Sequence, residues 1–169
     1  MKRLILLCVL SVVIFTTSYA QKEKYQSLYI YNFTKYIKWP ESYHADKFII
    51  GVIGDSEIFE SLKDMAAKKK TTASGVEMEV IKYKSVTEVG DCNILFVSHD
   101  AAGELVQIDT ETSSKPILIV TESPGLATQG SVINFVELND KVKFELNESE
   151  ASNRGLEVSG ALTSLAIVI

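Results

Sequence analysis

Three short, continuous apolar segments constrain the fold of this chain more than any other feature. They span residues 47–53, 93–97 and 116–120. Each is shorter than an ordinary helix and shows no alternation of apolar and polar residues, which is typical of strands covered by helices on both faces. Polar residues suited to starting a helix follow the first two segments, at Gly54-Asp55-Ser56 and Ser98-His99-Asp100. The pattern predicts an α/β domain with a mixed, largely parallel sheet.

The remaining segments complete a single domain. We expect a helix with an aromatic face over residues 22–38, ended by Pro40, and an edge strand over 77–83, where apolar and charged residues alternate. Two strands flank Asn139-Asp140, whose side chains tolerate positive φ, so a β-hairpin is predicted there. A helix over 148–154 and a terminal helix over 159–168 follow, with Gly155 as C-cap and Ser159 as N-cap. We therefore expect helices on both faces of the sheet and a C-terminal hairpin followed by helices.

Residues 1–20 have the features of a secretory signal peptide. Lys2 and Arg3 precede an apolar run over residues 4–15, and small residues, Ser18 and Ala20, stand where cleavage is expected. The run is shorter than the roughly 20 apolar residues that a membrane-spanning helix needs. We expect cleavage after Ala20, export to the periplasm of a domain over residues 21–169, and no direct membrane insertion after cleavage.

Removal of the signal peptide changes both the thiol content and the charge. Cys8 leaves with it, so Cys92 becomes the single thiol and no internal disulfide is expected. Without Lys2 and Arg3, 15 basic and 22 acidic side chains leave a net charge of −7. An acidic protein repels phosphate groups, which argues against binding to nucleic acid or to an anionic membrane surface.

Polar side chains follow three of the predicted strands, where ligands bind in many α/β sheets. If those strands are parallel neighbours, one edge of the sheet carries Asp55, Ser56, Ser98, His99, Glu122 and Ser123. This edge is the predicted ligand or partner site. The simpler alternative is that the Asp and Ser side chains cap helices. A hydrolase is a weaker alternative, because no Gly-x-Ser-x-Gly motif is present.

Metal and cofactor sites are not predicted. His44, Cys92 and His99 lack the paired spacing of zinc ligands. Gly51 and Gly54 do not complete a dinucleotide-binding fingerprint, which needs a third glycine and a downstream acidic residue. The dense aromatic residues of 29–39 are mostly expected in the core. Tyr31 and Trp39 are the candidates for outward-facing anchors that bind a partner.

Beyond these patterns, the ordered segments of the chain resemble one known family. Residues 29–40, with the sequence Tyr-Ile-Tyr-Asn-Phe-Thr-Lys-Tyr-Ile-Lys-Trp-Pro, are similar to the N-terminal signature of YfiR-like proteins. Residues 50–55, 92–98, 116–122, 133–135, 142–147 and 155–159 follow in the family's order, and the resemblance covers residues 25–169. The set is specific because of its order, although each piece alone is not.

The resemblance implies a periplasmic α/β regulator without catalytic residues. YfiR-type proteins restrain an inner-membrane diguanylate cyclase through its periplasmic part, which links envelope signals to cyclic-di-GMP and biofilm formation, and they also self-associate. The implied partners are therefore a membrane signalling protein and a second copy of the chain. The disulfide-bearing members have a second cysteine that is absent here, so only an intermolecular Cys92 disulfide is left open. The alternative is a periplasmic small-ligand binding module that uses the edge at Asp55, His99 and Glu122.

Overall fold

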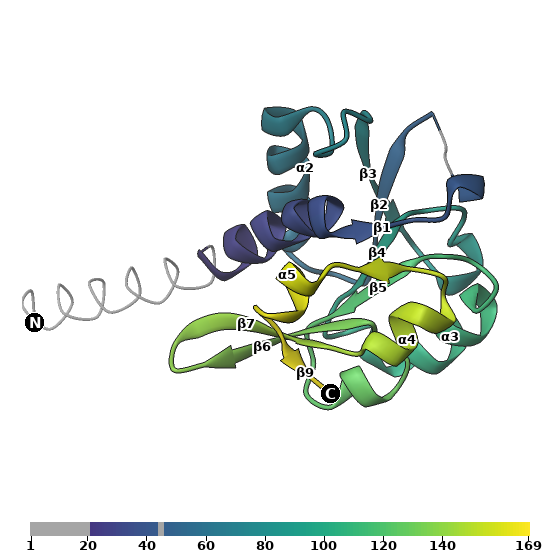
Figure 1. The fold of residues 1–169 in the computed structure, drawn as a ribbon. Coiled ribbons are helices and arrows are strands. Elements are labelled where there is room, and N and C mark those ends of the chain that lie inside the picture. The colour runs from purple at the N-terminus through teal and green to yellow at the C-terminus, as the bar shows by residue number, and fades with distance from the viewer. Residues whose placement is uncertain (1–20, 44–45) are drawn as a thin grey trace, which may run out of the picture.

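A seven-stranded sheet forms the centre of the molecule (Figure 1). The computed structural model describes residues 21–43 and 46–169, so the predicted signal peptide lies outside the described residues. The strand order is β3-β2-β4-β5-β6-β7-β9, and every neighbouring pair is parallel except the β6–β7 hairpin. The strands are β2 (Phe48–Ile53), β3 (Met78–Tyr83), β4 (Ile94–Val97), β5 (Leu118–Thr121), β6 (Ile133–Leu138), β7 (Lys141–Leu146) and β9 (Ile167–Val168). The predicted mixed, largely parallel sheet is confirmed, with β3 at its edge.

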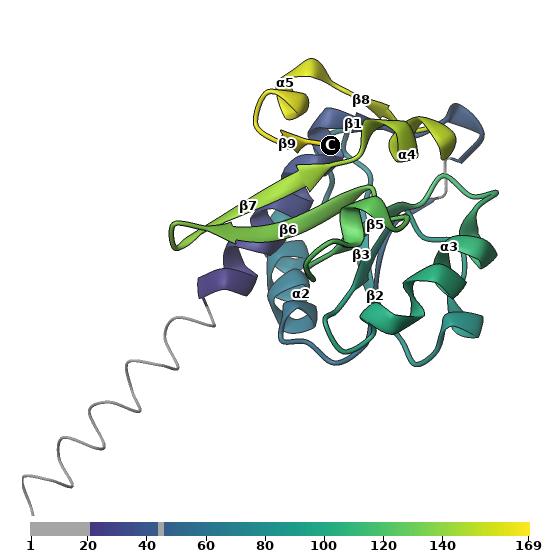
Figure 2. The same cartoon turned by 90° about the horizontal axis from the view of Figure 1, so that it is seen from below.

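Helices cover both faces of this sheet, as expected (Figures 1 and 2). A helix over residues 21–36, α2 (Ile58–Lys69), α4 (Glu148–Asn153) and α5 (Gly160–Thr163) contribute buried side chains to one core. On the opposite face, α3 (Leu105–Thr112) packs Leu105 and Ile108 into a second core. This arrangement explains why the strands are continuously apolar. Successive side chains of a strand point to opposite faces of the sheet, and each face is covered by one of the two cores.

The N-terminal helix packs through the aromatic face that its sequence predicts. Phe33 is fully buried, with ring centroids 6.1 Å from Phe135 and 5.5 Å from Phe144. The predicted C-terminal end of this helix is wrong, because residues 37–38 form β1 (Ile37–Lys38) instead of a last helical turn. This strand pairs antiparallel with β8 (Glu157–Val158), so a tertiary contact outweighs the local helical pattern.

The hairpin has the predicted turn. Asn139 and Asp140 both have positive φ, 52° and 57°, which suits a two-residue type I′ connection. The register runs from Leu138 opposite Lys141 to Ile133 opposite Leu146.

The last segment of the chain differs from its prediction. The predicted N-cap is confirmed, because the Ser159 side chain accepts a hydrogen bond from the backbone N–H of Leu162. The C-cap of α4 is Arg154, one residue before the predicted Gly155, which follows it with a φ of 70°. The terminal helix over 159–168 is wrong, since α5 covers four residues and β9 then pairs in parallel with β7. Ile167 and Val168 are β-branched, and pairing with β7 gives their backbone groups partners that a frayed helix end would lack.

Candidate functional site

The three strand ends that carry the predicted site do lie together. In the sheet, β4 lies between β2 and β5, and the three strands are parallel. Their carboxyl ends therefore form one edge, as the sequence analysis expects. Polar contacts divide the residues at this edge into three groups.

Asp100 is the centre of the first group. Its carboxylate accepts hydrogen bonds from the Ser98 hydroxyl and, at 2.9 Å, from the backbone N–H of Asp55. These bonds, the Ser98 bond first, lower the pKa of Asp100. Asp55 in turn pairs with Lys82 at 3.0 Å. The group joins the loops after β2 and β4 and holds them in a fixed arrangement.

Gly54 allows this close approach of the two loops. Its φ is +89°, and a Cβ built on it would overlap the Ser98 hydroxyl and lie 2.6 Å from the Asp100 carboxylate. A side chain at this position would be strained by the backbone and would push the two loops apart.

His99 and Ser123 form the second group. Nδ1 of His99 lies 2.8 Å from Oγ of Ser123, which is buried, whereas the histidine is exposed. Within residues 21–43 and 46–169, no carboxylate is hydrogen-bonded to the His99 ring. A Ser-His-Asp triad depends on such a carboxylate to orient the imidazole.

Glu122 forms the third group and contacts the N-terminal helix. Its Oε2 accepts hydrogen bonds from Nζ of Lys22 at 2.8 Å and from Nε2 of Gln26 at 3.1 Å. The neighbouring Glu23 is buried, and that burial is the main cause of its raised pKa. Glu122 therefore holds the N-terminal helix against the end of β5.

The alternative interpretation, in which the Asp and Ser side chains at this edge cap helices, is confirmed only in part. Helix α2 has Glu57 at its N-cap, without a side-chain hydrogen bond there. The hydroxyl of Ser56 instead accepts a bond of 3.3 Å from the backbone N–H of Ile58. The six predicted residues are thus engaged with one another or with the chain, and ligand binding at this edge stays a prediction.

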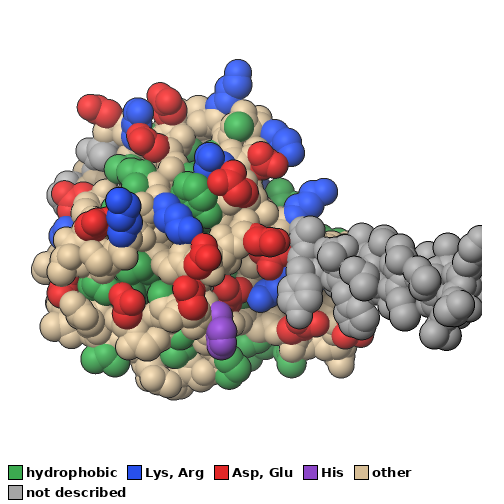
Figure 3. All heavy atoms as spheres, turned by 180° about the vertical axis from the view of Figure 1, so that it is seen from behind, with side chains coloured by type: hydrophobic (Ala, Val, Ile, Leu, Met, Phe, Trp, Pro, Cys, Tyr) green, Lys and Arg blue, Asp and Glu red, His purple; other side chains and the backbone are tan. Residues whose placement is uncertain are grey.

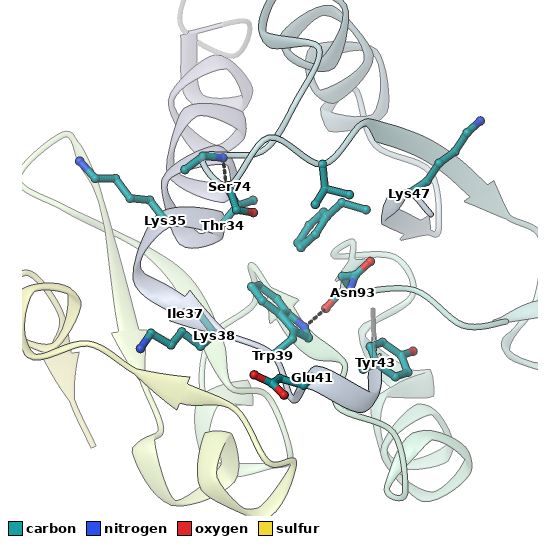
Figure 4. A pocket seen from close by; sticks show the side chains of 13 residues that line it. Thr34, Lys35, Ile37, Lys38, Trp39, Glu41, Tyr43, Lys47, Ser74 and Asn93 are labelled. Carbon is teal, nitrogen blue, oxygen red and sulfur yellow. Dashed lines mark hydrogen bonds between the residues drawn. The ribbon is translucent and has the colours of Figure 1, made fainter. Parts of the chain in front are cut away.

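A pocket of about 560 Å³ lies at the opposite, amino-terminal edge of the sheet (Figure 4). It is bounded by the end of the N-terminal helix, by β1 and by the segments that enter β2, β3 and β4. Its lining residues are Thr34, Lys35, Ile37, Lys38, Trp39, Glu41, Tyr43, Lys47, Phe48, Ala73, Ser74, Val76 and Asn93. None of them belongs to the predicted edge.

Trp39 is fixed at the centre of this pocket. Its Nε1 donates a hydrogen bond of 3.1 Å to the backbone oxygen of Asn93, and its ring meets Phe48 edge to face at 5.0 Å (Figure 4). Beside it, the Tyr43 hydroxyl donates to the backbone oxygen of Cys92 at 3.1 Å. The half-buried indole is thus a rigid wall of the pocket, and its role as a partner anchor stays a prediction.

The other predicted anchor, Tyr31, is half-buried against the main core. Nζ of Lys69 lies 4.8 Å from the centroid of its ring, within the range of a cation–π contact. Whether Tyr31 contacts a partner stays a prediction.

Cys92 is packed in the second core. It is 1% exposed, and burial raises the pKa of its thiol to about 12. A neutral, covered thiol is a poor nucleophile. An intermolecular disulfide through Cys92 would require local opening of the fold.

Three further observations on the described part of the molecule concern surface charge, metal ligands and membrane-spanning helices. On the face in Figure 3, acidic and basic side chains are interspersed and do not form a broad patch of one sign. Residues 21–43 and 46–169 contain no group of three or more His, Cys, Asp or Glu side chains arranged to hold a metal ion. No helix in that part combines the length and apolarity that crossing a membrane requires.

Sequence reasoning missed the amino-terminal pocket because four separate stretches of sequence build it, within residues 34–43, 47–48, 73–76 and at Asn93. One signal was present: Lys35, Lys38 and Lys47 stand close in sequence to the single tryptophan of the chain, in an otherwise acidic protein. That signal does not reveal Asn93, which is far away in sequence and reaches the pocket only through the pairing of β2 with β4.

A YfiR/HmsC-like family model matches residues 23–167, which is most of the chain. The chain belongs to the YfiR/HmsC-like family. Membership suggests a periplasmic regulator, in a family that is not known for enzymatic activity. A search of curated proteins finds no significant match. The family match over residues 23–167 confirms the resemblance described from residues 29–40 and the later segments.

Proposed function

We propose that this protein is an exported, non-enzymatic regulator that binds and restrains the periplasmic part of an inner-membrane signalling protein, such as a diguanylate cyclase. The observation that carries this proposal is the family match over residues 23–167. Cyclic-di-GMP output, and with it biofilm formation, would then depend on the bound or free state of this domain.

An exposed apolar segment at the end of the sheet supports partner binding. Leu165 is 62% exposed and Val168 48%, and the neighbouring Ile167 and Ile169 are also exposed. Among residues 21–43 and 46–169, strand β9 pairs only with β7, so its other edge is open to further strand pairing. Apolar side chains beside an open strand edge suit the addition of a partner's extended segment. The same edge could pair with a second copy of this chain, which is the route to the expected homodimer.

Leu165 offers a direct test, because Val106 on α3 is a matched control. Leu165 is 62% exposed and Val106 67%, so lysine costs little folding stability at either position. We expect tagged residues 21–169 to recover a membrane signalling protein from solubilised membranes of the native cell. Leu165→Lys should reduce that recovery at least about tenfold, whereas Val106→Lys should leave it unchanged.

Two results would count against the proposal. Recovery of no membrane signalling protein by the unsubstituted domain contradicts the function itself. Equal recovery by Leu165→Lys and the unsubstituted domain would leave the function standing and reject the β9 edge as its surface. Analytical ultracentrifugation of the same variants separates self-association from partner binding.

A further inference from the structure

We propose that the pocket at the amino-terminal edge of the sheet binds a small organic acid with an apolar body, whose acidic group accepts a hydrogen bond from Asn93. The site is distinct from the predicted edge at the carboxyl ends of the strands and from the β9 edge. The inference does not depend on the proposed regulatory function.

The size and walls of the pocket suit an apolar body. A volume of about 560 Å³ lies within the range of small-molecule sites, about 300–1,000 Å³. The walls include Ile37, Trp39, Phe48 and Val76, and the indole is held by its hydrogen bond to the Asn93 backbone. A wall that is already rigid loses little conformational entropy when a ligand covers it.

Asn93 provides a hydrogen-bond donor at the pocket. Asn93 as a whole residue is 7% exposed, and its Oδ1 accepts a hydrogen bond of 2.8 Å from the backbone N–H of Ile49. That bond fixes the orientation of the amide, because only the oxygen can accept from Ile49. The Nδ2 group then has no acceptor among the described residues. Asn93 lines the pocket, so this donor is available to an oxygen atom of a ligand.

The charges around the pocket favour an anion. The lining residues include three lysines and one glutamate, in a protein whose net charge is −5. Lys47 is paired with Glu79 at 3.0 Å, whereas Lys35 and Lys38 form no ion pair among the described residues. Figure 4 shows the ends of the three lysine side chains pointing outward around the pocket. A basic rim around a partly enclosed, apolar space attracts a carboxylate more strongly than isolated surface lysines do.

Trp39 makes the binding directly measurable, since it is the single tryptophan of the chain. Octanoate is a suitable probe, because it joins a carboxylate to an apolar body and does not absorb where tryptophan does. We expect a saturable change in Trp39 fluorescence as octanoate is raised to about 20 mM. Octanamide has the same body without the charge and should bind roughly fivefold more weakly.

Four variants, two of them controls, locate the ligand. Asn93→Asp keeps an acceptor for Ile49 but removes the donor and adds a negative charge, so octanoate should bind at least about tenfold more weakly. Asn32→Asp adds the same charge at an exposed position of the N-terminal helix and should change affinity less than about twofold.

The third variant, Lys35→Gln/Lys38→Gln, should weaken octanoate about fivefold, and a control with Lys68→Gln/Lys141→Gln at exposed sites should not. Circular dichroism confirms that each variant is folded.

The proposal is overturned if neither Trp39 fluorescence nor ligand-observed NMR detects octanoate. It is also overturned if octanamide binds as tightly as octanoate, because the pocket would then recognise apolar bodies without regard to charge. Unchanged affinity in folded Asn93→Asp would reject the assigned donor and with it the proposed binding mode.

Discussion

Arg154 connects the two helix layers of the domain, and its replacement should be costly. It lies at the C-terminal end of α4, and its side chain is 1% exposed. Nε donates to Glu150 at 2.8 Å, one terminal nitrogen donates to the backbone and side-chain oxygens of Thr112 at 3.3 Å, and the other contacts Asp109. Thr112 is the last residue of α3. The guanidinium of Arg154 therefore also interacts favourably with the negative end of the α3 helix dipole. One guanidinium thus bridges α4 on one face of the sheet and α3 on the other.

Removing one partner of a buried ion pair costs about 3–5 kcal/mol. Asp109 and Glu150 are 39% and 19% exposed, so water can partly solvate them once the guanidinium is gone. We therefore expect Arg154→Met to lower the free energy of unfolding by about 2–3 kcal/mol, or Tm by roughly 6–9 °C in a domain of this size.

Urea unfolding followed by Trp39 fluorescence measures this loss. Lys115→Met is the matched control, because the Lys115–Asp91 pair has a separation of 2.8 Å but side chains that are 33% and 77% exposed. That pair should contribute less than about 1 kcal/mol. If Arg154→Met is no more destabilising than Lys115→Met, the bridging role assigned to Arg154 is wrong.

Three further predictions concern single residues. Gly54→Ala should destabilise the domain by about 2 kcal/mol or more in urea unfolding, because of its positive φ and the overlap with Ser98; a loss below about 0.5 kcal/mol would refute this. The raised pKa of Cys92 favours the neutral thiol in the fold. The contribution of Cys92 to the free energy of unfolding should therefore be constant below about pH 9 and be lost as pH rises toward 12, and iodoacetamide at about pH 8 should react far more slowly with the folded protein than with the protein in urea. The lowered pKa of Asp100 stabilises the fold above the unfolded pKa of 3.8, and that contribution is lost as pH falls; Asp100→Asn should thus make stability less dependent on pH below about pH 4, and an unchanged acid profile would argue against it.

Local chemistry explains which elements were predictable from the sequence. The strands at residues 48–53 and 94–97 are apolar on both faces, and the Asn139-Asp140 turn needs residues that tolerate positive φ, so each carries its own signal. The ends of the N-terminal helix and of the last segment carried misleading signals. At 37–38 and 167–168, strand pairing with residues far away in sequence outweighs a helical pattern of apolar side chains.

The site was less predictable than the fold, for a related reason. The rule that ligands bind at the carboxyl ends of parallel strands correctly groups Asp55, His99 and Glu122 at one edge. It says nothing about whether such side chains are already engaged, and here Glu122 holds Lys22 and Gln26. The pocket at the opposite edge depends on how loops enter the strands, which periodicity does not describe.

The pairing of β1 with β8 has a consequence for how the domain can form. Ile37 lies opposite Val158 and Lys38 opposite Glu157, so a segment near the start of the domain is completed by one near its end. The backbone of residue 36 also accepts a hydrogen bond from Ser159. Contacts between such distant segments slow folding, because the whole intervening loop must be closed first. During synthesis the N-terminal helix emerges early, but β1 at its end has no partner strand until residues 157–158 have been made. A chain that lacks residues 157–158 therefore cannot close the side of the domain that this contact closes.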